Sequence, residues 1–526
     1  MTDQPRKISR RTLLAAAPAA GAVALTGVST SAFAAAAVPE RWDVETEVLV
    51  LGFGGAGAVA AVTAHDAGAR VLVIEKQAAA GHTSNTQMSL GVFLSPDNVD
   101  DTIAYMDVAS RVNVDMPGSK DLDDETIRVW AEESVRNRDW LTAMGASGFT
   151  LFANSGRDPD WPGNSAIKAY QLAKPDGTAG VGVDFFAFLE GLVTARGIGV
   201  LWGMAASRLI RGADGAILGA LADGPGGRQI AIRASRAVVV TTGGFEFDEA
   251  AQRTYMAAYP MTYYGNPDNT GDGMRMCQEV GSDLWHMTVL GGGLKFKFDD
   301  FPTAFAPSFG TGSYMVVDKT GERYKSETLL GGYSGYWNVL VYDTEEYTWP
   351  RIPSWFVFDE KRRTAGRLVP TLFGAAGPIG MYEWSADNSA EIARGWILSS
   401  DTIEGLAAQM NVDPAALAAQ AAQFNDAVAA GNDAAFGRPA GSMAALDAPP
   451  YYAVALWPGL NNTFGGPRRN ARGQVLDVFG APIRRLYSAG ELGSIFVQYP
   501  QGGANVGECL AFGRIAGANA AAETPA

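Results

Sequence analysis

Cysteine and histidine are scarce in this chain. Its 526 residues include two cysteines, Cys277 and Cys509, and three histidines. The cysteines lie far apart and Cys509 falls in an apolar segment, so we expect free buried thiols rather than a disulfide. The absence of a C-x-x-C-H motif excludes covalently carried haem on this chain. We also expect no metal site.

Long uncharged apolar runs are missing after residue 34, which predicts that the protein is not an integral membrane protein. Positive charge is also in the minority. There are 41 Lys and Arg residues against 56 Asp and Glu residues, for a formal net charge of −15. This acidic balance argues against nucleic acid and against anionic membranes as partners.

The first 34 residues differ from the rest. A basic head contains the pair Arg10-Arg11, an Ala/Val/Leu run follows, and Ala32-Phe33-Ala34 is an A-x-A cleavage pattern. We expect residues 1–34 to be a twin-arginine signal peptide, and the mature protein to be periplasmic or extracellular. The alternative is a basic tail on a membrane anchor.

What is plentiful is glycine, with 63 residues. A glycine-rich loop, Gly52 to Gly57, follows a predicted strand from Glu45 to Val50. It opens a predicted helix that runs to Ala67, and a second strand, Arg70 to Ile74, ends at Glu75. A strand, a glycine loop, a helix, a strand and an acid about 20 residues on form the dinucleotide-binding unit.

Each residue of this loop has a physical role in such a unit. Gly52 makes the tight turn, Gly54 lets the backbone approach a pyrophosphate, and Gly57 permits close packing of helix on strand. Glu75 is expected to bind a ribose hydroxyl.

The chain is too long for one simple core, so we expect two or three domains. The predicted fold class is α/β, with a Rossmann-like nucleotide-binding domain formed by residues 40–285 and 453–526. Residues 286–452 differ in composition, because aromatic residues, Pro and Gly become dense at 296–356. They also include an Ala-rich helical pair, Thr402 to Gln409 and Pro414 to Ala430. We predict that they form an inserted α+β substrate (capping) domain.

Further motifs follow in a fixed order. They are Thr241-Thr242-Gly243-Gly244-Phe245 at a strand end, Thr270-Gly271-Asp272-Gly273 before a helix, and Ser488-Ala489-Gly490-Glu491 near the C-terminus. With the Gly52 loop and Glu75, they resemble the FAD-binding family of fumarate reductases, urocanate reductases and 3-ketosteroid dehydrogenases. The resemblance runs from about residue 44 to residue 522.

The resemblance implies that the nucleotide is FAD. It implies contacts from the glycine loop, the 80–91 loop, the strand ends and the last helix, whose N-terminus would stabilise reduced flavin. The implied FAD contacts are Gly52, Gly54, Gly55, Ala56, Gly57, Glu75, Lys76, Gly81, His82, Thr83, Ser84, Ser89, Gly91, Thr242, Gly243, Asp272, Gly490, Glu491, Asn505 and Val506, with Asn85 as a further loop contact.

His82 has a second interpretation. Succinate dehydrogenase flavoproteins attach FAD covalently through a histidine in a similar Ser-His-Thr loop, and Gly81-His82-Thr83 resembles it with His82 placed one residue early. Covalent and non-covalent FAD both stay open.

The branch of the family is indicated by what faces the substrate. Fumarate reductases carry a proton-donating Arg a few residues after a motif that resembles Gly321 to Glu327, and here Gly331 takes its place. Tyr499-Pro500-Gln501-Gly502-Gly503 instead resembles the Tyr-Pro-Gly-x-Gly segment of ketosteroid dehydrogenases, with Gln501 as the departure. In that branch a Tyr hydroxyl and a Gly N–H hold the substrate ketone, so Tyr499 and Gly503 would polarise a carbonyl.

The resemblance therefore implies an FAD-dependent dehydrogenase that introduces a C=C bond beside the carbonyl of a cyclic ketone, either cyclohexanone-like or a 3-ketosteroid. Hydride would pass to the flavin and the α-proton to a Tyr base, with Tyr333 and Tyr336 as the candidates. The alternatives are an exported ene-reductase of the fumarate or urocanate type and a non-catalytic electron-transfer flavoprotein. Because the chain carries no haem motif, electrons must leave to a separate acceptor: a quinone, a carrier or oxygen.

Overall fold

The main sheet is built around the Gly52 loop. The computed structural model describes residues 36–333, 335–370 and 382–526. Within it, β1 (Val44–Leu51) and β2 (Val71–Glu75) are parallel neighbours joined by α1 (Gly55–Asp66). The predicted strand–helix–strand unit is therefore present, with its ends shifted by a residue or two. The signal peptide predicted at 1–34 lies outside the described residues.

Eight strands form this sheet, and five of them are parallel in the order β21, β9, β1, β2, β6. An antiparallel strand, β20, borders β21, and a β7–β8 hairpin extends from β9. The bounds of these additional strands are β6 Gly199–Trp202, β7 Ala205–Arg211, β8 Ile217–Asp223, β9 Gln229–Val240, β20 Gln474–Leu476 and β21 Pro482–Ser488. The carboxyl ends of β1, β2 and β9 meet at one edge, where ligands bind in open α/β sheets.

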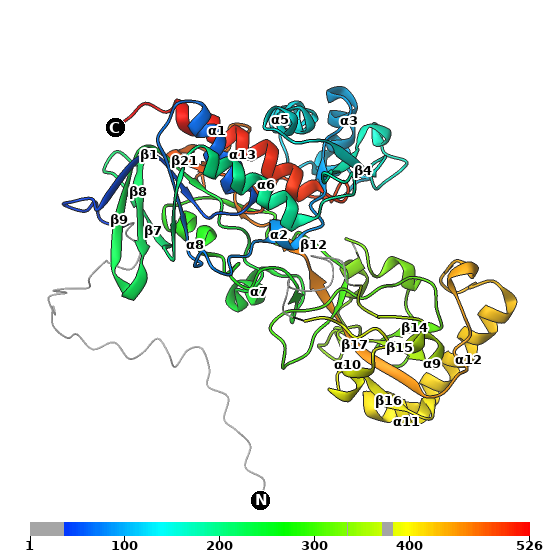
Figure 1. Cartoon of the computed structure of the whole chain (residues 1–526). Coiled ribbons are helices and arrows are strands. Elements are labelled where there is room, and N and C mark those ends of the chain that lie inside the picture. Colours follow the sequence, from blue (N-terminus) through cyan, green and yellow to red (C-terminus); the bar gives the residue numbers. More distant parts are fainter. Residues whose placement is uncertain (1–35, 334, 371–381) are drawn as a thin grey trace, which may run out of the picture. The chain divides into compact units, whose positions relative to one another are not determined.

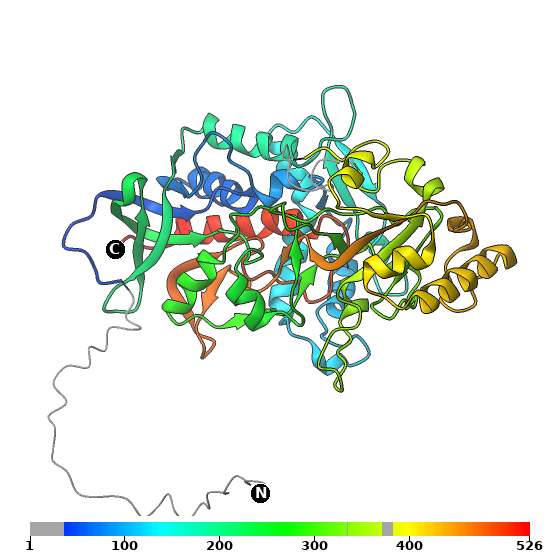
Figure 2. The same cartoon turned by 90° about the horizontal axis from the view of Figure 1, so that it is seen from below.

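Two helices distant in sequence pack side by side over this sheet. Figures 1 and 2 show α1, in blue, against α13 (Ala504–Ala522), in red. Small residues permit the approach: a Cβ built on Gly513 would lie 2.8 Å from the Val59 side chain, and one on Gly517 would lie 2.5 Å from the Ala60 carbonyl oxygen. The C-terminal helix thereby reaches the glycine loop.

A second sheet of six strands is centred on β17. It comprises β10 (Thr262–Tyr263), β13 (Leu294–Phe296), β14 (Tyr314–Val317), β15 (Ser354–Asp359), β16 (Leu398–Ser400) and β17 (Tyr451–Leu460). The sheet exceeds the predicted domain boundaries of 286 and 452, because β10 precedes the first and β17 continues past the second. A long strand with neighbours on both sides pairs with distant segments of the chain. The local amino-acid composition does not show which segments these are.

The remaining helices and strands surround these two sheets or form small sheets of their own. The helices are α2 Asn85–Met88, α3 Val99–Ala109, α4 Asp124–Val135, α5 Asn137–Ala143, α6 Gly182–Ala195, α7 Glu249–Tyr255, α8 Asp272–Glu279, α9 Glu360–Thr364, α10 Ser389–Ala393, α11 Ile403–Met410 and α12 Pro414–Ala430. The small sheets use β3 Phe93–Leu94, β4 Phe149–Ala153, β5 Ala169–Leu172, β11 Leu284–Trp285, β12 Leu290–Gly291, β18 Asn462–Thr463 and β19 Gly466–Pro467.

The predicted helical pair corresponds to α11 and α12, and the Asp413 side chain caps α12 by accepting from Ala416 N at 2.9 Å. The predicted α/β class is confirmed, with parallel strands in one sheet and mixed structure around the other. Among the described helices, none combines the length and apolar character needed to cross a membrane.

Candidate active site

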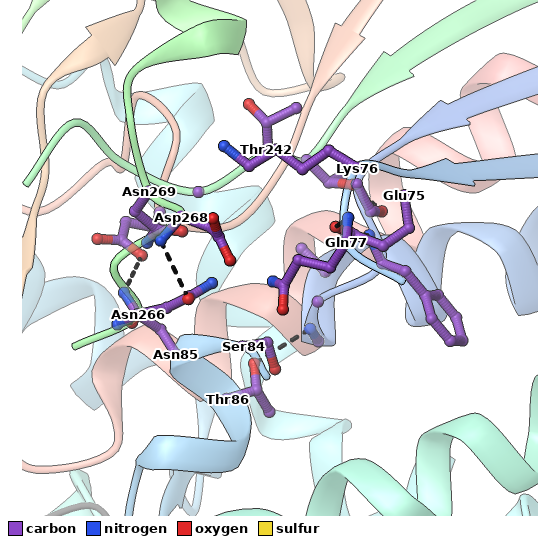
Figure 3. A pocket seen from close by; sticks show the side chains of 18 of the residues that line it. Glu75, Lys76, Gln77, Ser84, Asn85, Thr86, Thr242, Asn266, Asp268 and Asn269 are labelled. Atoms are coloured by element: carbon purple, nitrogen blue, oxygen red, sulfur yellow. Dashed lines mark hydrogen bonds between the residues drawn. The ribbon is translucent and has the colours of Figure 1, made fainter. Parts of the chain in front are cut away.

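A polar cavity opens where β1, β2 and β9 end. Figure 3 shows its walls, with Glu75, Lys76 and Gln77 on one side and Asn266, Asp268 and Asn269 on the other. Ser84, Asn85 and Thr86, at the start of α2, lie at the bottom of this view. The Asn85 side chain joins two walls, because its Oδ1 accepts from Asn266 N at 2.8 Å.

The glycine loop is held tightly at the mouth of this cavity. Gly52 has φ +97°, and a Cβ there would lie 2.8 Å from the Thr241 carbonyl oxygen. A Cβ on Gly57 would lie only 2.1 Å from the Gly52 carbonyl oxygen. Helix α1 begins after Gly54 with no side-chain cap, which leaves its N-terminus available to an anion such as a pyrophosphate.

Charged side chains at the end of β2 organise the same loop. The buried Glu75 carboxylate accepts from Phe53 N at 2.8 Å and from Gln77 N at 2.9 Å. Lys76 Nζ donates to Asp272 Oδ2 at 2.8 Å and thereby ties β2 to the start of α8. The ribose contact of Glu75 stays a prediction, whereas its role in ordering the loop is visible.

A buried pair of carboxyl groups lies where the cavity meets a second one. Asn85 Nδ2 donates to Glu491 Oε2 at 3.0 Å, and Thr463 N lies within hydrogen-bond distance of both Glu246 and Glu491. Burial raises the pKa of both carboxyl groups, and the neighbouring Glu246 raises the pKa of Glu491 further. Both carboxyl groups therefore hold a proton more readily than an exposed glutamate does.

Most of the expected cofactor residues line the first cavity. They are Gly52, Gly54, Gly55, Ala56, Glu75, Lys76, His82, Thr83, Ser84, Thr242, Gly243, Asp272 and Glu491. Ser89, Asn505 and Val506 line the second cavity, as does Glu491. Gly57 and Gly490 support the first cavity from behind, by packing on Gly52 and on the Ala56 side chain.

Three further expected site residues, Gly81, Gly91 and Tyr336, also line neither cavity. A Cβ on Gly91 would meet the backbone of Val181 at 2.6 Å, so this glycine serves chain packing. Gly81 is a turn glycine with φ +86° and open space beside it. Tyr336 is 1% exposed in the core of the second sheet, where its hydroxyl is hydrogen-bonded to the backbone of Leu290.

His82 sits in an aromatic environment. Its ring lies 5.1 Å from Trp202, 5.4 Å from Phe186 and 6.0 Å from Phe53, centroid to centroid. Burial lowers its pKa, so the imidazole is neutral at pH 7. The ring also lines the first cavity, so both forms of flavin attachment stay open.

The second cavity is larger and mostly apolar. It has a volume of about 480 Å³, and β13 of the second sheet, α2, the start of α13 and the loops around them line it, including Val92, Phe152, Tyr264, Lys295, Tyr333 and Tyr499. The start of α13 forms part of its wall, where Gly503 has φ +94° and the helix has no side-chain cap. A cavity of this size admits a ring-sized organic molecule.

Two tyrosines form the polar centre of this wall. The rings of Tyr333 and Tyr499 are stacked 4.0 Å apart at 18°, and their hydroxyls are hydrogen-bonded to each other. Burial raises both pKa values, but the hydrogen bonds from Tyr499 and Asn461 oppose the increase at Tyr333. The pKa of Tyr499 is raised well above its ordinary value by burial and by Tyr333. Tyr333 is therefore the more easily ionised of the two.

The turn between Tyr499 and Gly503 is fixed from outside the cavity. Gln501 Nε2 donates to Ser155 O at 2.8 Å, and its Oε1 accepts from Gly502 N at 2.7 Å. The Tyr105 hydroxyl donates to Pro500 O at 3.0 Å. Gln501, the departure from the resembled pattern, thus anchors the turn. The Trp161 ring packs on the Tyr105 ring.

Several residues that line the cavities are not among those predicted from the sequence. In the first cavity they include Phe53, Gln77, Thr86, Asn266, Asp268 and Asn269. In the second, Tyr264 and Lys295 come from β10–β13, a region without a recognisable motif. No arginine lines the second cavity among the described residues, and Gly331 stands in its wall, but Lys295 supplies a cation that the sequence reasoning did not anticipate.

Comparison with known proteins agrees with this site. Residues 47–506 match the family described as FAD binding domain. A probable fumarate reductase of Shewanella frigidimarina is 27% identical over 481 residues, 90% of this chain and 75% of that protein. The 4-oxocyclohexanecarboxylate 2-dehydrogenase of Sinomonas cyclohexanicum is 27% identical over 315 residues, 54% of this chain and 51% of that protein.

A solved structure shares the fold. The 3-ketosteroid Δ1-dehydrogenase of Sterolibacterium denitrificans superposes with a TM-score of 0.77 at 20% identity, covering 91% of this chain and 99% of that one. The protein belongs to the FAD-binding family and is an FAD-dependent oxidoreductase, and it shares its fold with the ketosteroid dehydrogenase structure.

The first cavity fits FAD on its own geometry. The uncapped N-terminus of α1 suits the pyrophosphate. Thr242 Oγ1 is buried at this cavity without a hydrogen-bond partner among the described residues, as expected of a group that binds a polar ligand.

Proposed function

We propose that the protein is a dehydrogenase that introduces a C=C bond α,β to the carbonyl of a cyclic ketone. The observation that carries this proposal is the stacked pair Tyr333–Tyr499 beside Gly503, in the wall of a ring-sized cavity. The cavity also adjoins the expected FAD site, because Glu491 and Cys509 line both. The Sinomonas cyclohexanicum relative, named for dehydrogenating a cyclic ketone, supports the same substrate class.

The residues divide the work as follows. The Tyr499 hydroxyl and the Gly503 N–H hold the ketone oxygen and stabilise the negative charge that develops on it, which acidifies the α C–H. The Tyr333 hydroxyl oxygen, once ionised, accepts the α-proton. The apolar walls position the ring and exclude water.

FAD held by the residues of the first cavity would supply the two-electron oxidant for the hydride that leaves the β carbon. The substrate thus loses one proton to Tyr333 and one hydride to the cofactor, and a C=C bond forms. The electrons then leave to a separate acceptor, a quinone, a carrier or oxygen.

An ene-reductase is the second candidate, favoured by the likeness to a probable fumarate reductase. It would run the same steps in the opposite direction from reduced FAD. Against a dicarboxylate substrate stands the wall of the second cavity, where the described lining residues include a single lysine and no arginine. A non-catalytic flavoprotein would have no use for the paired tyrosines.

Substitution of Tyr499 tests whether its hydroxyl holds the ketone oxygen. Tyr499→Phe keeps the stacked ring and removes the hydroxyl, so flavin reduction by cyclohexanone should slow by about a hundredfold. Tyr336→Phe is the matched control, because it removes a hydroxyl outside both cavities and should leave the rate within about twofold. Rapid anaerobic mixing measures both rates. Equal rates in the two variants would remove Tyr499 from the mechanism.

We also propose export by the twin-arginine route, which carries folded, cofactor-loaded proteins. Replacing Arg10 and Arg11 with lysines should retain the protein inside the cell, as fractionation would show. Unchanged export would refute that proposal.

A further inference from the structure

Lys295 is placed unusually for a lysine. It lies in β13, paired with Trp457 of β17, and it is 4% exposed. Its ammonium lies 5.2 Å from the centroid of the Tyr264 ring. No hydrogen bond or ion pair joins it to any residue that the structure describes. Lysines are almost never so deeply buried unless they are paired.

The described surroundings of Lys295 offer its ammonium group no ionic partner in the second cavity. Lys295 lines that cavity together with Tyr264, Tyr333 and Tyr499. Among the described residues of its wall the one acid is Glu491, whose carboxyl oxygens accept from Asn85 and Thr463 and whose pKa is raised by burial and by Glu246. No described residue of this wall forms an ion pair with Lys295.

Packing alone does not explain the ammonium group. The stem of Lys295 fills the space above Gly459, where a built Cβ would lie 1.9 Å from Lys295 Cγ. Methionine would fill that space without a buried charge, and a buried cation without a partner is destabilising. Burial also lowers the pKa of Lys295 to about 8, which still leaves it mostly protonated at pH 7. The charge is accounted for if a ligand neutralises it.

We propose that the substrate carries an anionic group, a carboxylate on the ketone ring, which pairs with Lys295 while the ketone oxygen lies at Tyr499 and Gly503. This inference rests on the proposed ketone site and narrows it. A neutral steroid would leave Lys295 unpaired, whereas a small ring with one carboxylate offers a partner to Lys295 as well as to the Tyr499 hydroxyl. Lys295 is thus a specificity-determining residue that takes no part in the transfer of hydrogen.

A binding measurement tests this inference independently of the proposed reaction. Titration calorimetry on the FAD-loaded protein at pH 7 compares 4-hydroxybenzoate with its neutral isostere 4-hydroxybenzamide; both present a phenol oxygen to the tyrosines. We expect the carboxylate to bind at least tenfold more tightly to the natural protein. Lys295→Met should abolish that preference, and Lys319→Met, which removes an exposed lysine, should retain it.

The kinetic arm uses 4-oxocyclohexanecarboxylate and its methyl ester as reductants of the flavin. The charged ketone should saturate at a concentration at least tenfold lower, and Lys295→Met should remove that difference with little change in the limiting rate. Equal affinity of the natural protein for the charged and neutral ligands would overturn the inference, even if the variant fails to fold. If neither ketone reduces the flavin while the benzoate preference depends on Lys295, the proposed reaction fails and the anion site stands.

Discussion

At the scale of single residues, the account depends on an asymmetry between two tyrosines. Tyr333 and Tyr499 are buried and stacked, yet hydrogen bonds favour the ionised form of Tyr333 and disfavour that of Tyr499. A neutral phenol is the better donor to a ketone, and an ionised phenol is a base. The environment thereby assigns the two roles that α,β-dehydrogenation needs.

The pH dependence of flavin reduction tests the assignment of Tyr333. Its pKa is raised above the ordinary value of 10, so the basic form is a minor species at neutral pH and increases as pH rises. The rate with a saturating ketone should therefore rise by up to about tenfold per pH unit between neutral and mildly alkaline pH.

Tyr333→Phe should lower that rate by about a hundredfold or more and remove the slope. The Tyr336→Phe variant is the control and should keep the slope. A variant at Tyr333 that is slow but still shows the full slope would assign the base elsewhere.

The residues that the sequence predicted well are those whose role is local. Gly52, Gly57 and Glu75 act within one strand–loop–helix–strand unit, and spacing along the chain is enough to find them. Lys295 and Asn266 escaped because their roles depend on strands and loops brought together from distant segments. Tyr336 was expected near the substrate only because it follows Tyr333 closely in sequence.

At the scale of elements, the junction of α1 and α13 connects the cofactor site to the substrate site. Helix α1 begins at the glycine loop, and α13 begins at Gly503 in the wall of the second cavity. Glycines at their contacts permit a close approach, so a change there should disturb both sites.

Gly57→Ala tests the cofactor side of this arrangement, where α1 packs on its own glycine loop. The added methyl would lie 2.1 Å from the Gly52 carbonyl oxygen, so the loop must shift. We expect the free energy of unfolding to fall by about 1–3 kcal/mol and FAD affinity to decrease. Thermal unfolding and flavin release measure the two effects.

Gly191→Ala is the matched control in α6, because a Cβ there meets nothing within 4 Å. It should raise the free energy of unfolding by about 0.5–1 kcal/mol and leave FAD binding unchanged. If the two substitutions behaved alike, the tight contact at Gly57 would not matter.

Elements also show where prediction from sequence stops. The α11–α12 pair could be found from capping residues and periodicity, and its bounds are nearly right. The limits of the second sheet could not, because β17 and β10 pair across almost two hundred residues of chain. Strand pairing of that kind leaves little local trace.

At the scale of the whole molecule, two sheets place one polar and one apolar cavity next to each other. The first suits a dinucleotide and the second a ring-sized ketone. Glu491 and Cys509, which lies in the first half of α13, line both cavities. The family and the cofactor could be read from ordered motifs along the chain, whereas the size of the second cavity and its buried cation required the folded structure.

Single-turnover mixing of the FAD-loaded protein with cyclohexanone and 4-oxocyclohexanecarboxylate, without oxygen, tests the central claim most directly. Absorbance follows the flavin, and mass spectrometry of the quenched mixture identifies the product. We expect the flavin to bleach and one equivalent of the α,β-unsaturated ketone to appear for each flavin reduced. Flavin that stays oxidised with both ketones, in protein whose chemically reduced flavin is reoxidised by fumarate, would contradict the account.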